Sequence, residues 1–183
     1  MTETDGKIVL DDSVQSAIVG LIGQACCRQR LGRFRSLTIG FGKKIPHGRP
    51  NLADDFYGEW QIGTYYAAWR VIKDGKILCG SRDVVDSLVE LEERFRQIQL
   101  GRINGIWMVS EFDIRIDLDD GIHIDFLGAA REDEDDEMLH IFCPNGLYVR
   151  YSTLDGWKVG DAGRRVDYSD EKQPKLITRY KST

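Results

Sequence analysis

The stretch FDIRIDLDDGIHIDF, residues 112–126, alternates apolar and polar side chains on both sides of the dipeptide Asp120-Gly121. Successive side chains of a β-strand point to opposite faces of a sheet, so this period of two gives each half one apolar face. The other face would carry the polar side chains Asp113, Arg115, Asp117, His123 and Asp125. Asp-Gly between two extended runs is typical of a hairpin turn, because glycine adopts a positive φ without steric cost. The stretch therefore predicts an antiparallel hairpin with one face packed on a core.

Two segments have the spacing of helices rather than of strands. The first predicts a short helix over about 13–21. The second has one apolar face and one charged face, which predicts a longer helix over about 84–99. Ser81 or Asp83 would cap its N-terminus, and Gly101 would end it.

The remaining apolar segments have the period of strands. Asp74-Gly75 predicts a second hairpin, whereas residues 42–58, with two prolines and three glycines, predict a long loop. Further short strands are expected at 37–41, 59–72, 106–110, 138–143, 147–151 and 157–159. This order of elements predicts an α+β fold with a mainly antiparallel sheet or sheets. We expect a single domain over 1–183, with loose ends at about 1–10 and 165–183.

The composition is that of an ordinary globular domain, with 42% apolar and 30% charged residues in a chain of 183. The cysteines have no C-x-x-C spacing and are too few for a disulfide framework, so we expect reduced thiols. Residues 1–12 lack the basic and apolar regions of a secretory signal, and no apolar run is long enough to cross a bilayer. These features predict a cytoplasmic protein that does not enter a membrane.

Charge is distributed unevenly along the chain. Residues 24–50 carry seven bases and no acid, and residues 111–137 carry twelve acids and two bases. The two segments could pair with each other, form solvated surface, or meet a charged partner. The net charge of −5 and the lack of a nucleic-acid-binding motif argue against a nucleic acid as that partner.

The sequence holds no motif for catalysis, a metal or a cofactor. Residues 40–44, GFGKK, contain glycine and lysine but lack the spacing of a phosphate loop and the helix that follows one. A calcium loop that began at Asp117 would need an acid at position 128, where the chain has Gly128. No zinc-type spacing joins the remaining candidate ligands, His123, His140 and Cys143. We therefore expect no metal and no cofactor, and a binding protein rather than an enzyme.

Two sets of residues are candidate binding sites. The first is an acidic run that would bind a basic protein: Glu132, Asp133, Glu134, Asp135, Asp136 and Glu137. The second would line a cleft of a small-ligand binder or an enzyme: Trp60, Tyr65, Trp69, Arg70 and Asp83. The aromatic residues of the second set could equally form the core. A third possibility is an oligomerising module that uses exposed strand edges, and the sequence leaves the oligomeric state open.

Several short segments together resemble a pattern of small bacterial proteins that have a Trp-Arg strand and a Gly-Ser-x-Asp segment. The matching segments are Gly58-Glu59-Trp60, Trp69-Arg70-Val71, Asp74-Gly75-Lys76-Ile77 and Gly80-Ser81-Arg82-Asp83. Many of those proteins have a histidine and a cysteine before the Trp-Arg pair, where this chain has residues 64–68. The resemblance implies no established activity. By analogy with immunity and accessory proteins of toxin systems, it implies a non-catalytic bacterial binding protein.

Overall fold

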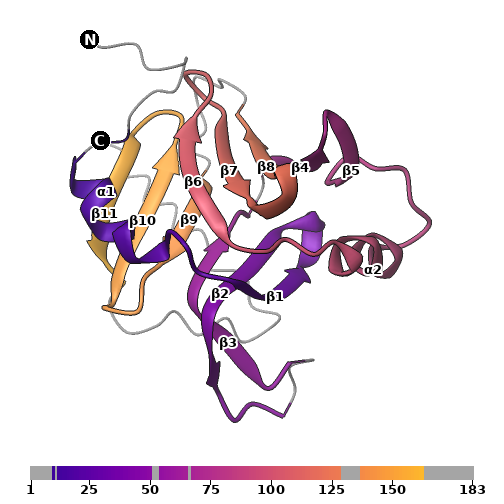
Figure 1. Cartoon of the computed structure of the whole chain (residues 1–183), viewed down its shortest axis with the longest axis horizontal. Helices are drawn as coiled ribbons and strands as arrows, with labels where there is room; N and C mark the ends of the chain where they lie inside the picture. Colours follow the sequence, from indigo (N-terminus) through magenta and orange to yellow (C-terminus); the bar gives the residue numbers. More distant parts are fainter. Residues whose placement is uncertain (1–9, 11, 51–53, 66, 129–136, 163–183) are drawn as a thin grey trace, which may run out of the picture.

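Two antiparallel β-sheets make up most of the protein (Figure 1). The structure, a computed structural model, describes residues 10, 12–50, 54–65, 67–128 and 137–162. The six-stranded sheet has the order β1-β2-β3-β9-β10-β11, with bounds Cys26–Leu31, Leu37–Pro46, Phe56–Gly63, Glu137–Phe142, Leu147–Ser152 and Gly156–Asp161. The five-stranded sheet has the order β5-β4-β8-β7-β6, with bounds Lys76–Gly80, Ala68–Lys73, Ile122–Leu127, Ile114–Leu118 and Ile103–Met108. This architecture confirms the expected α+β fold with antiparallel sheets.

Short helices complete the described part of the chain. They are the α-helices α1 (Asp12–Ile18) and α2 (Leu88–Gln97) and the 3₁₀ turns η1 (Val19–Leu21), η2 (Arg33–Arg35) and η3 (Asp119–Gly121). Both predicted helices are present, but α2 begins later than residue 84. The side chain of Ser87, and not that of Ser81 or Asp83, accepts the backbone N–H of Glu90 and so caps α2.

Both Asp-Gly dipeptides form hairpin turns, as the sequence predicts. Lys73 pairs with Lys76 across Asp74-Gly75, whose φ angles are +51° and +74°. Asp120-Gly121 lies in η3 between β7 and β8, with φ angles of +56° and +69°. Aspartate and glycine are among the residues that enter this left-handed region most readily, so the turn chemistry explains both hairpins.

The apolar faces of the two sheets contribute to one buried cluster. In β7 and β8, Ile114, Ile116 and Ile124 are completely buried, and Arg115 on the opposite face is partly exposed. The alternation of the sequence therefore predicts the buried face correctly. Asp125 is the exception, because it lies on the polar face and yet is only 1% exposed.

The loop predicted over 42–58 is shorter than expected, because residues 42–46 and 56–58 belong to the two strands of a hairpin, and the described residues 47–50 and 54–55 lie between them. Strand β2 continues to Pro46 and β3 begins at Phe56, with Ile45 paired with Tyr57. Pro46 is the last residue of its strand, where a missing N–H is tolerated. We call residues 43–46 and 54–57 the arm; it extends below the rest of the described chain in Figure 1.

Leu10 is 8% exposed and belongs to the buried cluster. The other residues of the expected loose ends, 1–9 and 165–183, lie outside the described residues. Among the helices that the structure describes, none is long and apolar enough to cross a membrane. All four cysteines are free thiols, in agreement with their expected reduced state.

Candidate anion-binding pocket

A bend in the β2–β3 hairpin brings the arm next to β1. The register of the hairpin shifts between Phe41 and Lys44, and Gly42 within this interval has a φ of +80°. A Cβ atom on Gly58 would lie 2.5 Å from the Cα atom of Gly40. Only glycine at position 58 permits this backbone approach, so the glycines that suggested a loop produce the bend.

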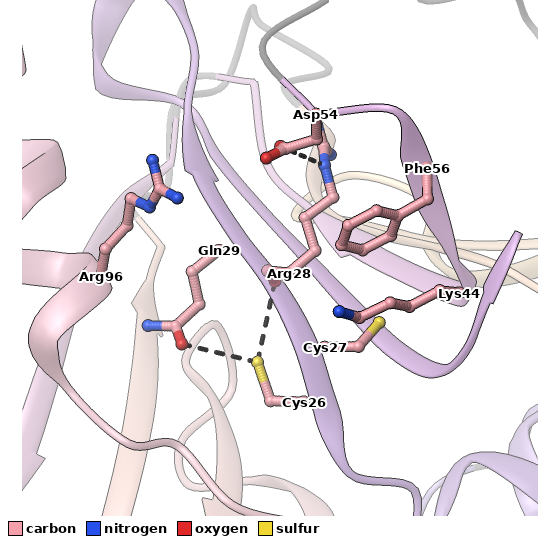
Figure 2. A pocket seen from close by; sticks show the side chains of 8 residues that line it. All are labelled: Cys26, Cys27, Arg28, Gln29, Lys44, Asp54, Phe56 and Arg96. Atoms are coloured by element: carbon pink, nitrogen blue, oxygen red, sulfur yellow. Dashed lines mark hydrogen bonds and ion pairs between the residues drawn. The ribbon is translucent and has the colours of Figure 1, made fainter. Parts of the chain in front are cut away.

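A cavity of about 400 Å³ lies between β1, the arm and α2 (Figure 2). Its wall carries the charged side chains Arg28, Lys44, Arg96 and Asp54, the ring of Phe56 and the thiols of Cys26 and Cys27. In Figure 2, Lys44 and Arg96 approach the cavity from opposite sides. Three cations and one carboxylate give this wall a formal charge of +2.

An ion-pair network fixes the inner part of the wall. The Nε atom of Arg28 donates to Oδ2 of Asp54 at 2.8 Å, and Nε of Arg30 lies 3.6 Å from the same oxygen. Arg30 also pairs with Glu92 of α2 at 3.1 Å. The Arg28 and Asp54 side chains are only 12% and 14% exposed, so water screens this pair less than a surface pair.

Helix α2 is attached to the edge of β1 by side chains that belong to this wall. Nε2 of Gln29 donates to the backbone oxygens of Phe95 and Ile98, at 2.7 and 3.1 Å. These carbonyls lie in the last turn of α2 and just beyond it, and the Phe95 carbonyl also accepts the backbone N–H of Ile98. Gln29 therefore adds a donor at the end of the helix, where carbonyl groups have few intrahelical partners. The backbone N–H of Leu31 donates to Glu92, which satisfies an edge group of β1. The position of Arg96 relative to β1 is therefore well defined.

Lys44 and Arg96 make no ion pair with any residue that the structure describes. The Nζ atom of Lys44 lies 4.6 Å from the centroid of the Phe56 ring, within the range of a cation–π contact. Such a contact leaves the ammonium N–H groups available to an acceptor. The cavity thus has two cations whose charge is not neutralised by a carboxylate.

The two thiols on the wall are poor nucleophiles. Burial raises the pKa of Cys26 to about 12. Burial also raises the pKa of Cys27, although the positive charges of Lys44 and Arg28 oppose this effect. The thiolate is the reactive form, so both residues are protonated and unreactive near neutral pH. The cavity is therefore better suited to binding than to thiol chemistry.

The structure places only one residue of the predicted acidic run. Residues 132–136 lie outside the described residues, and Glu137 begins β9. The carboxylate of Glu137 lies 2.8 Å from Nδ1 of His140 and accepts a hydrogen bond from Tyr148 at 2.5 Å. Burial acts to raise the pKa of Glu137, but the contacts with His140 and Tyr148 lower it overall. The side chain of Glu137 is thus engaged within its own sheet.

The residues predicted to line a cleft are divided between the two sheets. Trp60 in β3 and Trp69 in β4 are 6% and 1% exposed and belong to the core. Arg70 pairs with Asp125 at 3.1 Å and not with Asp83, whose backbone oxygen accepts a hydrogen bond from Arg35. Arg35 links two members of the set, because its backbone oxygen accepts from the Trp69 indole and its guanidinium donates to Asp83, whereas Trp60 lies in the other sheet.

Tyr65, from that same predicted set, lies beside a residue from the acidic run. Its ring centroid is 4.8 Å from that of His140, the partner of Glu137. Tyr65 and Glu137 belong to different candidate sites in the sequence, and the structure joins them through His140 of β9, with Tyr65 in the bend that follows β3.

The sequence pattern does not predict this cavity, although five of the eight residues that line it lie in the basic segment 24–50. Arg28 and Lys44 belong to the basic segment 24–50, which the charge pattern singles out. Arg96 falls on the charged face of the helix predicted over about 84–99, and Asp54 and Phe56 fall in the loop predicted over 42–58. The signal that could have found them is the GFGKK segment, because its glycines bend the hairpin.

Comparisons with known proteins give no match: no family model, no curated protein and no solved structure is similar to this chain.

Proposed function

We propose that this protein binds a small anionic ligand in the cavity between β1, the arm and α2. The observation that carries the proposal is that Lys44 and Arg96 face a common cavity without a carboxylate partner in the described residues. Unpaired cations on the wall of a concave site create a positive potential that attracts anions. The hydrogen bonds of Gln29 and the ion pairs of Arg30 support a preformed site, because they fix α2 against β1.

Isothermal titration calorimetry with sulfate at low ionic strength tests this function. We expect Lys44→Ala and Arg96→Ala each to weaken sulfate binding about tenfold, since a hydrogen bond to a charged group contributes about 1.5–3 kcal/mol. Lys76→Ala is the matched control, because Lys76 is an exposed strand lysine in the other sheet. If all three variants bound sulfate as tightly as the wild type, the cavity would not be the anion site.

A second function remains a proposal: recognition of a basic protein through the acidic run 132–137. The two ends of the segment that contains this run support it. The backbone N–H of Gly128 donates to Asp113 at 2.9 Å, and Glu137 is held by His140 and Tyr148. These contacts would display the segment from fixed points. The resemblance to small bacterial proteins with a Trp-Arg strand, and their analogy with immunity and accessory proteins, also favour such a partner.

A pull-down at low and high salt tests the second function. A variant with Glu132, Glu134 and Asp136 changed to the corresponding amides should lose a partner that the wild type recovers at low salt. Release of the partner at high salt is expected for association through surface charge. Recovery of the same partner by the variant would refute a role for the acidic run.

Free thiols at all four cysteines fit a reducing compartment, so we also propose a cytoplasmic location for either function.

A further inference from the structure

The geometry points to a phosphate monoester on a small organic group as the ligand of the basic cavity. This inference rests on the proposed anion-binding function and narrows it to one chemical class. Three properties of the cavity carry the inference: its charge, the arrangement of its donors and its volume.

The charge of the wall matches a dianion. Asp54 offsets one of the three cations, which leaves a formal charge of +2. A phosphate monoester carries a charge of about −1.5 to −2 at pH 7, whereas a carboxylate or a phosphate diester carries −1. A bound monoanion would leave the wall with a formal charge of +1.

The donors surround the cavity and do not lie in one plane. Lys44 and Arg96 approach from opposite sides in Figure 2, and Arg28 lies between β1 and the arm. An ammonium group offers three N–H donors and a guanidinium group offers five. The hydrogen bond that Arg28 makes with Asp54 uses its Nε atom, so its Nη atoms still offer donors. Three terminal oxygens of a tetrahedral phosphate can each face a different donor, but a planar carboxylate has only two oxygens.

The volume leaves room for more than the anion. The cavity measures about 400 Å³, whereas a water molecule occupies about 30 Å³ in the liquid. Cavities of roughly 300–1,000 Å³ are typical sites for small organic ligands. The ring of Phe56 and the protonated thiols of Cys26 and Cys27 provide weakly polar surface for such a group. An inorganic phosphate ion alone would leave this surface unused.

Calorimetry with a matched set of probes tests the inference. Phenyl phosphate, methyl phenyl phosphate, benzoate and inorganic phosphate differ in charge, in shape or in the presence of a ring. At pH 7.5 and low ionic strength, we expect the wild type to bind phenyl phosphate at least tenfold more tightly than each of the other three. Lys44→Ala and Arg96→Ala should each remove most of this preference, and Lys76→Ala should keep it.

The pH dependence of binding reports the charge of the bound ligand. A purely structural role of Lys44 and Arg96 would not produce this dependence. Phenyl phosphate loses its second negative charge below about pH 6, and sulfate stays doubly charged. The affinity for phenyl phosphate should therefore fall several-fold between pH 7.5 and pH 5, and the affinity for sulfate should change less.

The outcomes separate the inference from the function on which it rests. If benzoate or methyl phenyl phosphate bound as tightly as phenyl phosphate, the phosphate class would be refuted and anion binding would stand. If an oligothymidylate bound more tightly than phenyl phosphate and lost affinity in the Lys44→Ala variant, the ligand would be a polymer and the inference would be wrong. If neither sulfate nor phenyl phosphate bound, the function and the inference would both fail.

Discussion

An aspartate meets two arginines at two places in this protein, and the two clusters use the same charges differently. Asp125 in β8 lies directly across from Arg70 in β4 and from Arg115 in β7. Its carboxylate accepts hydrogen bonds from both guanidinium groups, and its side chain is only 2% exposed. Asp54 accepts from Arg28 and lies near Arg30, but its side chain is 14% exposed.

The difference lies in how the backbone presents the charges. In the Asp125 cluster, sheet register places one carboxylate between two arginines, and both guanidinium groups are paired with that carboxylate. In the Asp54 cluster, the cations come from separate elements, and Lys44 and Arg96 add positive charge that Asp54 does not offset. We infer that the Asp125 cluster stabilises the fold and that the Asp54 cluster serves binding.

The largest effect is expected from Asp125→Asn. This change leaves Arg70 and Arg115 without their carboxylate and removes charge-assisted hydrogen bonds from a buried position. We expect a loss of about 2–4 kcal/mol in the free energy of unfolding, toward the lower end because both arginines can still reach water. Urea denaturation followed by circular dichroism measures it, with the exposed Glu93→Ala as control. A loss equal to that of Glu93→Ala would contradict a stabilising role.

The dependence of stability on pH gives a second view of the Asp125 cluster. Burial acts to raise the pKa of Asp125, but hydrogen bonds and charge from Arg115 and Arg70 bring it below its usual range. A carboxyl group with a lowered pKa in the folded state favours folding above its unfolded pKa of about 4. That contribution is lost as the pH falls through the folded pKa. Urea midpoints between pH 6 and pH 2.5 should therefore drop in the wild type and drop less steeply in Asp125→Asn; parallel curves would contradict this origin.

How far the sequence predicts the two clusters depends on how local their determinants are. Alternation within 112–126 places Arg115 and Asp125 on one face, because strand period and the Asp-Gly turn are local properties. The alternation does not show that Asp125 is more deeply buried than His123. The burial of each side chain depends on its neighbour in β4, which is Arg70 for Asp125 and Ile72 for His123.

The cavity depends on contacts that the sequence pattern does not encode. Arg96 has the spacing of a solvated helix face, and it reaches the cavity only because Gln29 and Glu92 attach α2 to β1. Lys44 reaches it because Gly58 and Gly40 allow the hairpin to bend. The contacts between α2 and β1, and between Gly58 and Gly40, join segments that are distant along the chain. Periodicity and turn chemistry therefore predict the sheets but not the cavity.

A smaller effect on stability is expected from Asp54→Asn. The amide keeps the shape of the side chain but removes the negative charge beside Arg28 and Arg30. We expect a loss of about 1–2 kcal/mol in the free energy of unfolding, because Glu92 still pairs with Arg30 and the site is less buried than Asp125.

The same change affects binding, because the formal charge of the wall would rise from +2 to +3. Calorimetry should then show several-fold tighter sulfate binding, and unchanged or weaker binding would argue that Asp54 orients Arg28 toward the ligand.

The smallest effects on stability are expected from Lys44→Ala and Arg96→Ala, and they separate the two clusters most clearly. Both side chains are exposed and neither makes an ion pair within the described residues, so each change should alter the free energy of unfolding by at most about 0.5 kcal/mol. The cation–π contact of Lys44 with Phe56 is included in that limit. Urea denaturation of both variants beside the wild type gives the measurement. A loss above 1 kcal/mol would show that these cations support the fold as Arg70 and Arg115 do. Near-native stability combined with weakened anion binding is the result expected of residues whose charge is left free for a ligand.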